Sequence, residues 1–333
     1  MKLGKLPFEY LSEMLNKIPE YDSRVALGAS PGEDAALIDI GEKYLVATTD
    51  PITFATEQVG WYAVNVNAND IASMGGTPKW MMANLLLPKN TTKDNIDNIF
   101  TQLINACNEL DIKLVGGHTE ITNTVNTPVI MGCMLGEVDK GKEIKSSGAM
   151  KEDSIIITKS IPIEGSAILA SEKESLLISK NIPQSHIDTA KKLLLNPGIS
   201  IVLDAQVAIN SAPIHAMHDS TEGGIAQGLR ELAKASNLGM QIDQDKIPLI
   251  DISRDFWESL NLNPLGVIAS GTLIICVNQQ NATIVIQSLI ANGIKATEIG
   301  TMKEVEYGLK MLSNGINYDL PNFDQDEITK IFD

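Results

Sequence analysis

The sequence predicts a mixed α/β protein built from two domains, on three observations. Segments rich in β-forming residues alternate with segments of helical periodicity along the chain. At 333 residues the chain is long for one hydrophobic core, because domains typically hold about 100–200 residues. Residues 139–153 are charged, contain glycine and lack apolar periodicity, which is typical of a linker. We therefore expect one domain over 1–148 and a second over 149–333.

The expected elements of the first domain begin with a short amphipathic helix within 1–19. The further expected helices are 58–74 and 92–110, and the expected strands are 43–48, 79–87, 112–115 and 127–138. Strand 112–115 runs into Gly116-Gly117, which we expect to form a turn. A glycine pair after a strand frees backbone N–H groups, which often cradle phosphates.

Helix 58–74 carries an unusual set of polar residues within an apolar pattern. At about 100° per residue, one stripe holds Trp61, Val64, Ala68 and Ile71. Asp70 falls roughly opposite this stripe, so the pattern predicts that the helix buries the stripe and presents Asp70 outward. The asparagines of this helix either line a ligand cleft or only support the Asp70 region. They are Asn65, Asn67 and Asn69.

The second domain continues the alternation of strands and helices. The expected strands are 154–159, 214–217, 272–277, 296–299 and 304–311, and the expected helices are 164–195 with a break at 181–183, 199–211, about 222–235 and 282–291. Before helix 222–235, the residues Asp219, Ser220 and Thr221 are suitable N-caps. The same helix N-terminus could hold an anion.

Composition excludes several classes of function. A formal charge of −16 without a Lys/Arg cluster argues against nucleic-acid binding. No apolar run approaches the roughly 20 residues that span a bilayer, so we expect no membrane association and a cytoplasmic location. Three widely separated cysteines, Cys107, Cys133 and Cys276, fit a reducing compartment and have neither a disulfide nor a zinc spacing.

Four acidic residues of the first domain stand at strand ends, on the polar face of the helix, or in glycine-rich turns. They are Asp34, Asp50, Asp70 and Glu120. If they converge, their oxygens would suit Mg²⁺, and nearby glycine N–H groups would hold phosphates that the metal bridges. Such a site would serve phosphoryl transfer, which needs mainly positioning and charge neutralisation.

Five motifs, in this order and spacing, resemble those of the AIR synthase (PurM-like) ATP-binding superfamily. They are Gly-Glu-Asp-Ala-Ala (32–36), Thr-Thr-Asp (48–50), Asn-Asp-Ile-Ala-Ser-Met-Gly-Gly-Thr-Pro (69–78), Gly-Gly-His-Thr-Glu (116–120) and His-Asp-Ser-Thr-Glu-Gly-Gly (218–224). The resemblance implies a two-domain PurM-like fold, with an N-terminal sheet domain that dimerises and a C-terminal α/β domain. It also implies a homodimer that binds ATP with Mg²⁺.

The resemblance assigns roles to individual residues. The implied metal ligands are Asp34, Asp50 and Asp70; the implied nucleotide-binding residues are Gly32, Asn69, Gly116, Gly117, Thr119 and Glu120; the implied catalytic residues are Asp50, Asp70, His118 and Asp219. Several relatives have an acidic residue at the position of His118. Here either Glu120 takes the place of that acidic residue, or the third metal position is absent. His118 itself is either catalytic or a hydrogen-bonding turn residue.

Among members of the superfamily, the motifs at 69–78 and 218–224 are most similar to those of the hydrogenase maturation factor HypE. HypE carries its reaction on a C-terminal cysteine, whereas the last cysteine here, Cys276, lies in an expected strand. We therefore expect an Mg²⁺-dependent ATP enzyme that phosphorylates an oxygen of a small carbonyl, amide or phosphate acceptor, including carbamoyl-type acceptors. Reactions like those of thiamine monophosphate kinase or selenophosphate synthetase are alternatives. A nucleotide-binding maturation accessory without turnover, acting with a protein partner, is another.

Overall fold

The computed structural model describes residues 4–19, 21–53 and 57–332. They form two compact units. The N-terminal unit comprises 21–28 and 35–143, and the C-terminal unit comprises 144–333 with 29–34 and 1–20, as far as these ranges are described. The observed division near 143 lies close to the expected linker. It differs from the expected domains in placing the loop 29–34 and the N-terminal helix in the C-terminal unit.

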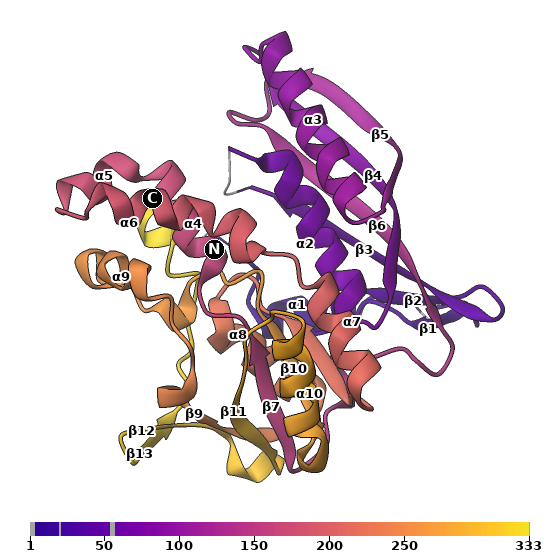
Figure 1. Ribbon diagram of the computed structural model, residues 1–333. Helices are drawn as coiled ribbons and strands as arrows, with labels where there is room; N and C mark the ends of the chain where they lie inside the picture. The colour runs from indigo at the N-terminus through magenta and orange to yellow at the C-terminus, as the bar shows by residue number, and fades with distance from the viewer. Residues whose placement is uncertain (1–3, 20, 54–56, 333) are drawn as a thin grey trace. The chain divides into compact units, whose positions relative to one another are not determined.

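The described part of the N-terminal unit contains a six-stranded sheet in the order β1-β2-β3-β6-β4-β5. Its strands are β1 (Val25–Leu27), β2 (Ala36–Asp39), β3 (Lys43–Ile52), β4 (Thr77–Pro88), β5 (Lys113–Thr122) and β6 (Val129–Asp139). Neighbouring strands are antiparallel except β4 and β5, which run parallel. Helices α2 (Val59–Ser73) and α3 (Lys93–Glu109) cover one face of this sheet (Figure 1).

Helix α2 is buried along its whole length. The expected apolar stripe of α2 is confirmed as buried, but the expectation that Asp70 points outward is wrong, because Asp70 is only 6% exposed. The helix contacts β3, β4, β6 and α3. A side chain opposite the apolar stripe therefore still meets protein, and polar residues on α2 need hydrogen-bond partners from the chain.

The glycine pair at 116–117 does not form a turn after a strand, as was expected. Both glycines lie inside β5, where Gly116 pairs with Met82 and Gly117 with Ala83 of β4. Gly117 has a φ of +146°, and a Cβ atom there would lie 1.9 Å from the carbonyl oxygen of Ala83. Glycine at this position lets two backbones approach closely at an irregular register, so it continues the strand instead of ending it.

The described part of the C-terminal unit contains a seven-stranded sheet in the order β13-β12-β9-β11-β7-β10-β8. Its strands are β7 (Asp153–Thr158), β8 (Ala216–Asp219), β9 (Gly239–Asp243), β10 (Leu273–Asn278), β11 (Ala296–Lys303), β12 (Leu309–Ser313) and β13 (Ile316–Asp319). Its helices are α1 (Phe8–Leu15), α4 (Ile163–Glu172), α5 (Glu174–Ser179), α6 (Gln184–Lys192), α7 (Val202–Ser211), α8 (Gly224–Ala235), α9 (Arg254–Leu260), α10 (Gln279–Ala291) and α11 (Thr329–Phe332).

The core of this unit lies between α8 and one face of the sheet. Side chains of α8 such as Leu229 and Leu232 pack with Ile155, Ile157 and Ile274 of β7 and β10. Helix α10 contacts β7, β10, β11 and helix α7. The mixed α/β class and the two-sheet architecture predicted from the sequence are confirmed, although β1, β9, β13, α9 and α11 were not anticipated.

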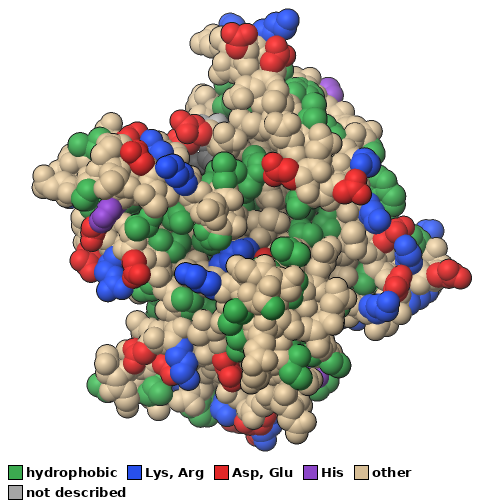
Figure 2. Space-filling view, viewed as in Figure 1, with side chains coloured by type: hydrophobic (Ala, Val, Ile, Leu, Met, Phe, Trp, Pro, Cys, Tyr) green, Lys and Arg blue, Asp and Glu red, His purple; other side chains and the backbone are tan. Residues whose placement is uncertain are grey.

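The surface mixes charges of both signs. On the face drawn in Figure 2, acidic and basic side chains are interspersed among apolar ones. In the described part of the chain, no single helix has both the length and the apolar character needed to cross a bilayer. One bent pair of helical segments, 184–198 and 202–211, meets those criteria jointly.

Candidate functional site

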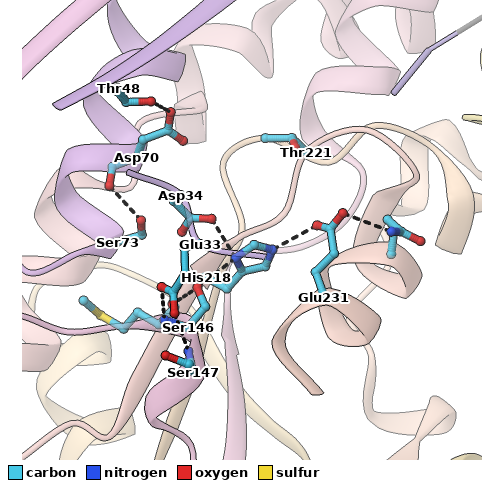
Figure 3. Close-up of polar contacts among 12 residues, drawn as sticks. Glu33, Asp34, Thr48, Asp70, Ser73, Ser146, Ser147, His218, Thr221 and Glu231 are labelled. Carbon is cyan, nitrogen blue, oxygen red and sulfur yellow. Dashed lines mark hydrogen bonds and ion pairs between the residues drawn. The ribbon is translucent and has the colours of Figure 1, made fainter. Parts of the chain in front are cut away.

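Asp50 and Asp70 of the N-terminal unit lie on the side of β3 that faces α2. The hydroxyl of Thr48 donates a 2.6 Å hydrogen bond to Oδ2 of Asp70 (Figure 3). Because side chains alternate along a strand, Asp50 points from the same face of β3 as Thr48. The two carboxylates thus come from neighbouring elements and are directed to one side of the sheet.

Sequence analysis left the role of the asparagines of α2 open, and the structure shows their hydrogen-bond partners. Asn67 accepts a 2.9 Å hydrogen bond from the backbone N–H of Asp50 and donates to its carbonyl oxygen at 3.3 Å. Asn67 and Asn65 also donate to carbonyls of the preceding helical turn. Asn69 is fully buried. Asn67 therefore fixes the backbone that carries Asp50, which explains an amide within a buried helix.

The expected nucleotide-binding residues 116–120 lie along β5, an edge strand. His118 and Glu120 point from one face, with His118 Nε2 3.2 Å from a carboxylate oxygen of Glu120. Their side chains are 67% and 48% exposed. Gly117 and Thr119 alternate with them on the other face. The strand therefore presents its polar residues to solvent, where they are accessible to a ligand.

A cavity of about 390 Å³ lies within the N-terminal unit, beside these residues. Its walls come from β4, α3 and β5, and are formed by Ala83, Leu85, Phe100, Leu103, Leu114, Val115, Gly116, Gly117, His118 and Thr119. The cavity combines apolar side chains with the backbone of the glycine pair. Such a lining suits a ligand with a planar apolar part and a polar end.

Asp34 belongs to the C-terminal unit, where it forms a buried ion pair. His218 Nδ1 lies 2.7 Å from Oδ1 of Asp34, and its Nε2 lies 3.2 Å from a carboxylate oxygen of Glu231 on α8 (Figure 3). Burial alone would lower the pKa of His218, but the two carboxylates raise this pKa well above its usual value. Both ring nitrogens therefore carry protons and donate. His218 thus fixes the orientation of Asp34.

Glu231 is ionised despite its burial. Desolvation raises the pKa of its carboxyl, but the Lys5 ammonium and the protonated His218 more than offset this and lower the pKa to about 2. The protonated His218 and the half-exposed Lys5 ammonium together therefore stabilise the Glu231 carboxylate.

The loop 29–34 is tied to the backbone of residues 146–147 and passes close to α8. Glu33 accepts hydrogen bonds from the backbone N–H groups of Ser146 and Ser147, at 3.0 and 3.2 Å. Gly32 has a φ of +85°, and a Cβ there would lie 3.0 Å from the carbonyl oxygen of Glu231. The glycine thus allows the loop to pass close to α8, and its role in nucleotide binding stays a prediction.

The N-terminus of α8 binds an anion from the chain itself. Asp219 is buried at the end of β8, but none of the expected residues 219–221 caps the helix, because its N-cap is Gly223 in the left-handed conformation. The carboxylate of Asp326 accepts a 2.7 Å hydrogen bond from the Gly223 N–H. The carboxylate of Asp326 therefore occupies one backbone N–H group at this helix N-terminus.

Glu164, near the start of α4, is a buried acid that sequence analysis missed. It is 5% exposed, and its Oε2 has no hydrogen-bond partner among the described residues. Burial raises its pKa to about 8; Ser270 donates hydrogen bonds that lower it, and the nearby carboxyls of Glu222 and Asp326 raise it. The carboxyl is therefore uncharged at neutral pH. An acidic residue within the apolar stretch 161–170 was the sequence signal for it.

The expected metal ligands are thus distributed over both units. Asp50 and Asp70 face one side of β3, whereas Asp34 is paired with His218 in the other unit. Within residues 4–19, 21–53 and 57–332, no group of three His, Cys, Asp or Glu side chains is arranged to hold a metal ion. Mg²⁺ commonly takes only one or two protein carboxylates and completes its shell with phosphates and water. The carboxylates of Asp50 and Asp70 are donors of that kind.

Comparison with known proteins supports the resemblance found in the sequence. The family model for the N-terminal domain of AIR synthase related proteins matches residues 32–138, and the model for their C-terminal domain matches residues 151–310. A hydrogenase expression/formation protein of Methanocaldococcus jannaschii is 31% identical over 285 residues, which cover 84% of this chain and 82% of that protein.

Two further relatives are named as enzymes. Carbamoyl dehydratase HypE of Rhizobium leguminosarum bv. viciae is 27% identical over 293 residues, covering 85% of this chain and 81% of that protein. Thiamine-monophosphate kinase of Aquifex aeolicus is 24% identical over 251 residues, covering 70% and 74%.

Solved structures share the fold at lower identity. The HypE–HypF complex contains a similar chain with a TM-score of 0.74 at 19% identity, covering 87% of this chain and 93% of that one. Hydrogenase maturation protein HypE in complex with ATP has a TM-score of 0.70 at 23% identity, covering 89% of each chain. The superfamily predicted from the five motifs is confirmed, and the chain belongs to the AIR synthase related protein family.

Proposed function

We propose that this protein is an Mg²⁺-dependent ATP enzyme that phosphorylates an oxygen of a small acceptor. The observation that carries the proposal is the pair of carboxylates on the α2-facing side of β3. Asp70 is oriented by Thr48, and the backbone of Asp50 is held by two hydrogen bonds with Asn67, one accepted and one donated by its side-chain amide. Carboxylates held in this way supply the hard oxygen donors that Mg²⁺ prefers.

When bound beside Asp50 and Asp70, Mg²⁺ would neutralise the phosphate charge of ATP. The residues of this chain would contribute positioning. Thr48 keeps one carboxylate oxygen of Asp70 directed toward β3, and Asn67 prevents the segment that carries Asp50 from shifting. Phosphoryl transfer needs little covalent chemistry from a protein, so this arrangement is sufficient without an activated nucleophile.

The nucleotide would bind along β5 and the adjoining cavity. Gly116, Gly117 and Thr119 are the residues that the family resemblance assigns to the phosphates, and all three line this cavity. His118, which pairs with Glu120 at the surface, also lines this cavity. A structure of HypE in complex with ATP has the same fold, which supports ATP as the nucleotide.

The acceptor is proposed to carry a carbonyl, amide or phosphate oxygen. The relatives that are named as carbamoyl dehydratase and as thiamine-monophosphate kinase support these two classes of acceptor. Among the cysteines of this sequence, Cys107 and Cys276 are buried and Cys133 is half-buried. A free small molecule is therefore a better acceptor than a thiol-bound group on this chain. Asp219 and the motif 218–224 would lie on the acceptor side.

We further propose a homodimer that forms through the edge strand β5. The strand has no partner on its outer side within the described residues, and Val115 and Ile121 on it are 57% and 51% exposed. An exposed apolar edge strand readily pairs with another chain. The HypE–HypF complex also supports a protein partner for a member of this family.

The proposed reaction is tested by measuring ADP release with candidate acceptors. Purified protein is incubated with Mg²⁺-ATP and with carbamoylated peptides, thiamine monophosphate, selenide or formylglycinamidine ribonucleotide in turn. We expect one acceptor class to accelerate ADP release, and Asp70→Asn to abolish the acceleration. ATP binding without ADP release under every condition would favour the alternative of a nucleotide-binding accessory protein.

A further inference from the structure

The N-terminal segment Gly4–Leu15, which includes α1, lies against the motif 218–224 within the C-terminal unit. The Lys5 ammonium donates a 2.8 Å hydrogen bond to Oγ1 of Thr221 and lies 3.4 Å from a carboxylate oxygen of Glu222. Thr221 and Glu222 belong to the same motif as His218, whose imidazole orients Asp34. The segment therefore touches the outer side of a motif that is part of the candidate site.

A second point of attachment lies on α8. Lys234 forms a 2.7 Å ion pair with Glu9, and its ammonium lies 4.1 Å from the ring centroid of Phe8. Lys234 thus holds helix α1 through the carboxylate of Glu9 and through the aromatic ring of Phe8.

Both attachments are made at the surface. No residue of α1 is buried. The side chains of Lys234 and Glu9 are 38% and 77% exposed, and those of Lys5 and Glu222 are 50% and 29% exposed. Exposed ion pairs contribute little stability and are weakened by salt. The apolar side chains Phe8, Leu11, Met14 and Leu15 are only partly buried, so no fully buried apolar side chain anchors the described residues of this segment.

An isolated helix of this length does not persist in water. Helices shorter than roughly 12–15 residues are marginal on their own, and α1 has 8 residues. Release of the segment from Lys234 would therefore also unfold α1. Its attachment and its helical structure should be lost together.

We propose that residues 4–15 form a strap that closes reversibly over Thr221 and Glu222, and that the strap opens to admit the acceptor. The role of the acceptor rests on the proposed function, whereas the opening itself does not. Lys5 closes the strap on the motif, and Lys234 holds its helix. In the closed state the Lys5 ammonium contacts the side chains of Thr221 and Glu222, which an acceptor would need to reach.

The test measures access to the motif by chemical labelling of the full chain. Glu222→Cys places a thiol under the strap and removes the Lys5–Glu222 ion pair, so this background tests the attachments that remain, Lys5 to Thr221 and Lys234 to α1. The rate of reaction of the thiol with a small neutral thiol reagent is measured with the background of the native cysteines subtracted. Adding Lys234→Ala should raise this rate about two- to tenfold, as expected for the loss of one surface ion pair with its cation–π contact. Glu9→Gln, which leaves α8 unchanged, should raise it in the same direction.

The matched control is Lys310→Ala, because Lys310 forms a surface ion pair with Asp319 whose side chains are 40% and 81% exposed. It should leave the labelling rate unchanged. Hydrogen exchange of the same variants should rise in the amides of α1 for Lys234→Ala and Glu9→Gln but not for Lys310→Ala.

Equal labelling and exchange in all variants would overturn the strap. Neither measurement needs ATP turnover, so the strap can stand if the proposed function fails. Conversely, ATP turnover together with unchanged labelling would support the proposed function and refute the proposed strap.

Discussion

Replacing Glu164 by glutamine should remove a pH dependence of stability. Glu164 is 5% exposed, and burial raises its pKa from 4.5 to about 8. A folded-state pKa above the unfolded value means that the folded protein binds the proton more tightly. The stability that Glu164 contributes is therefore greatest below about pH 4.5, and it is lost progressively as the pH rises to about 8.

The size of the effect follows from the shift. The difference between 8 and 4.5 is 3.5 units, and each unit corresponds to about 1.4 kcal/mol, so the full loss is about 5 kcal/mol. Between pH 6 and pH 8 the wild type should lose about 2 kcal/mol that the neutral glutamine variant retains. At low pH the variant should be slightly less stable, because its amide puts an N–H group where Oε2 of Glu164 has no described partner.

The assay is urea unfolding of wild type and Glu164→Gln at a series of pH values, with the unfolding midpoint converted to free energy. Asp326→Asn is the matched comparison, because burial raises the pKa of Asp326 to about 6. Its effect on the pH dependence should therefore be confined to pH values below about 6. Parallel curves for wild type and Glu164→Gln between pH 6 and pH 8 would refute the reasoning.

Three further predictions concern the fold and the surface. Gly117→Ala should destabilise the N-terminal unit by about 2–4 kcal/mol, since the new Cβ meets a β4 carbonyl at 1.9 Å; Gly116→Ala, with 3.9 Å of clearance, should change the melting temperature little. Burial raises the pKa of Cys107 to about 11 and that of Cys276 well above its usual value. Both thiols should resist a thiol reagent at pH 8 until the protein is denatured. Ile121→Lys should shift the protein from dimer to monomer in light scattering, and an unchanged mass would contradict pairing through β5.

The helix α2 shows how far the sequence alone could lead. Its apolar periodicity correctly predicted the helix and the stripe that it buries. Periodicity cannot reveal whether the opposite face meets solvent or another part of the chain, so Asp70 was wrongly expected to point outward. The partner of Asn67 is the backbone of Asp50, 17 residues away in sequence, and a hydrogen bond to a distant backbone has no sequence signature.

Other parts of the site depended on contacts across the chain in the same way. The glycines in β5 were interpreted as a turn because local propensity favours one, but pairing with β4 overrides that propensity. His218 stood in a motif that the sequence singled out, whereas its contact with Glu231 on α8 required the folded unit. Motif order sufficed to predict the family, because five spaced matches are jointly specific.

The most direct test of the central claim is a calorimetric titration of ATP into the full-length protein with and without Mg²⁺. The account predicts binding that is much tighter with Mg²⁺, lost in Asp70→Asn, and retained in Asp153→Asn, which alters an equally buried acid in the C-terminal unit. Absence of ATP binding, or equal binding by wild type and Asp70→Asn in the presence of Mg²⁺, would contradict the account.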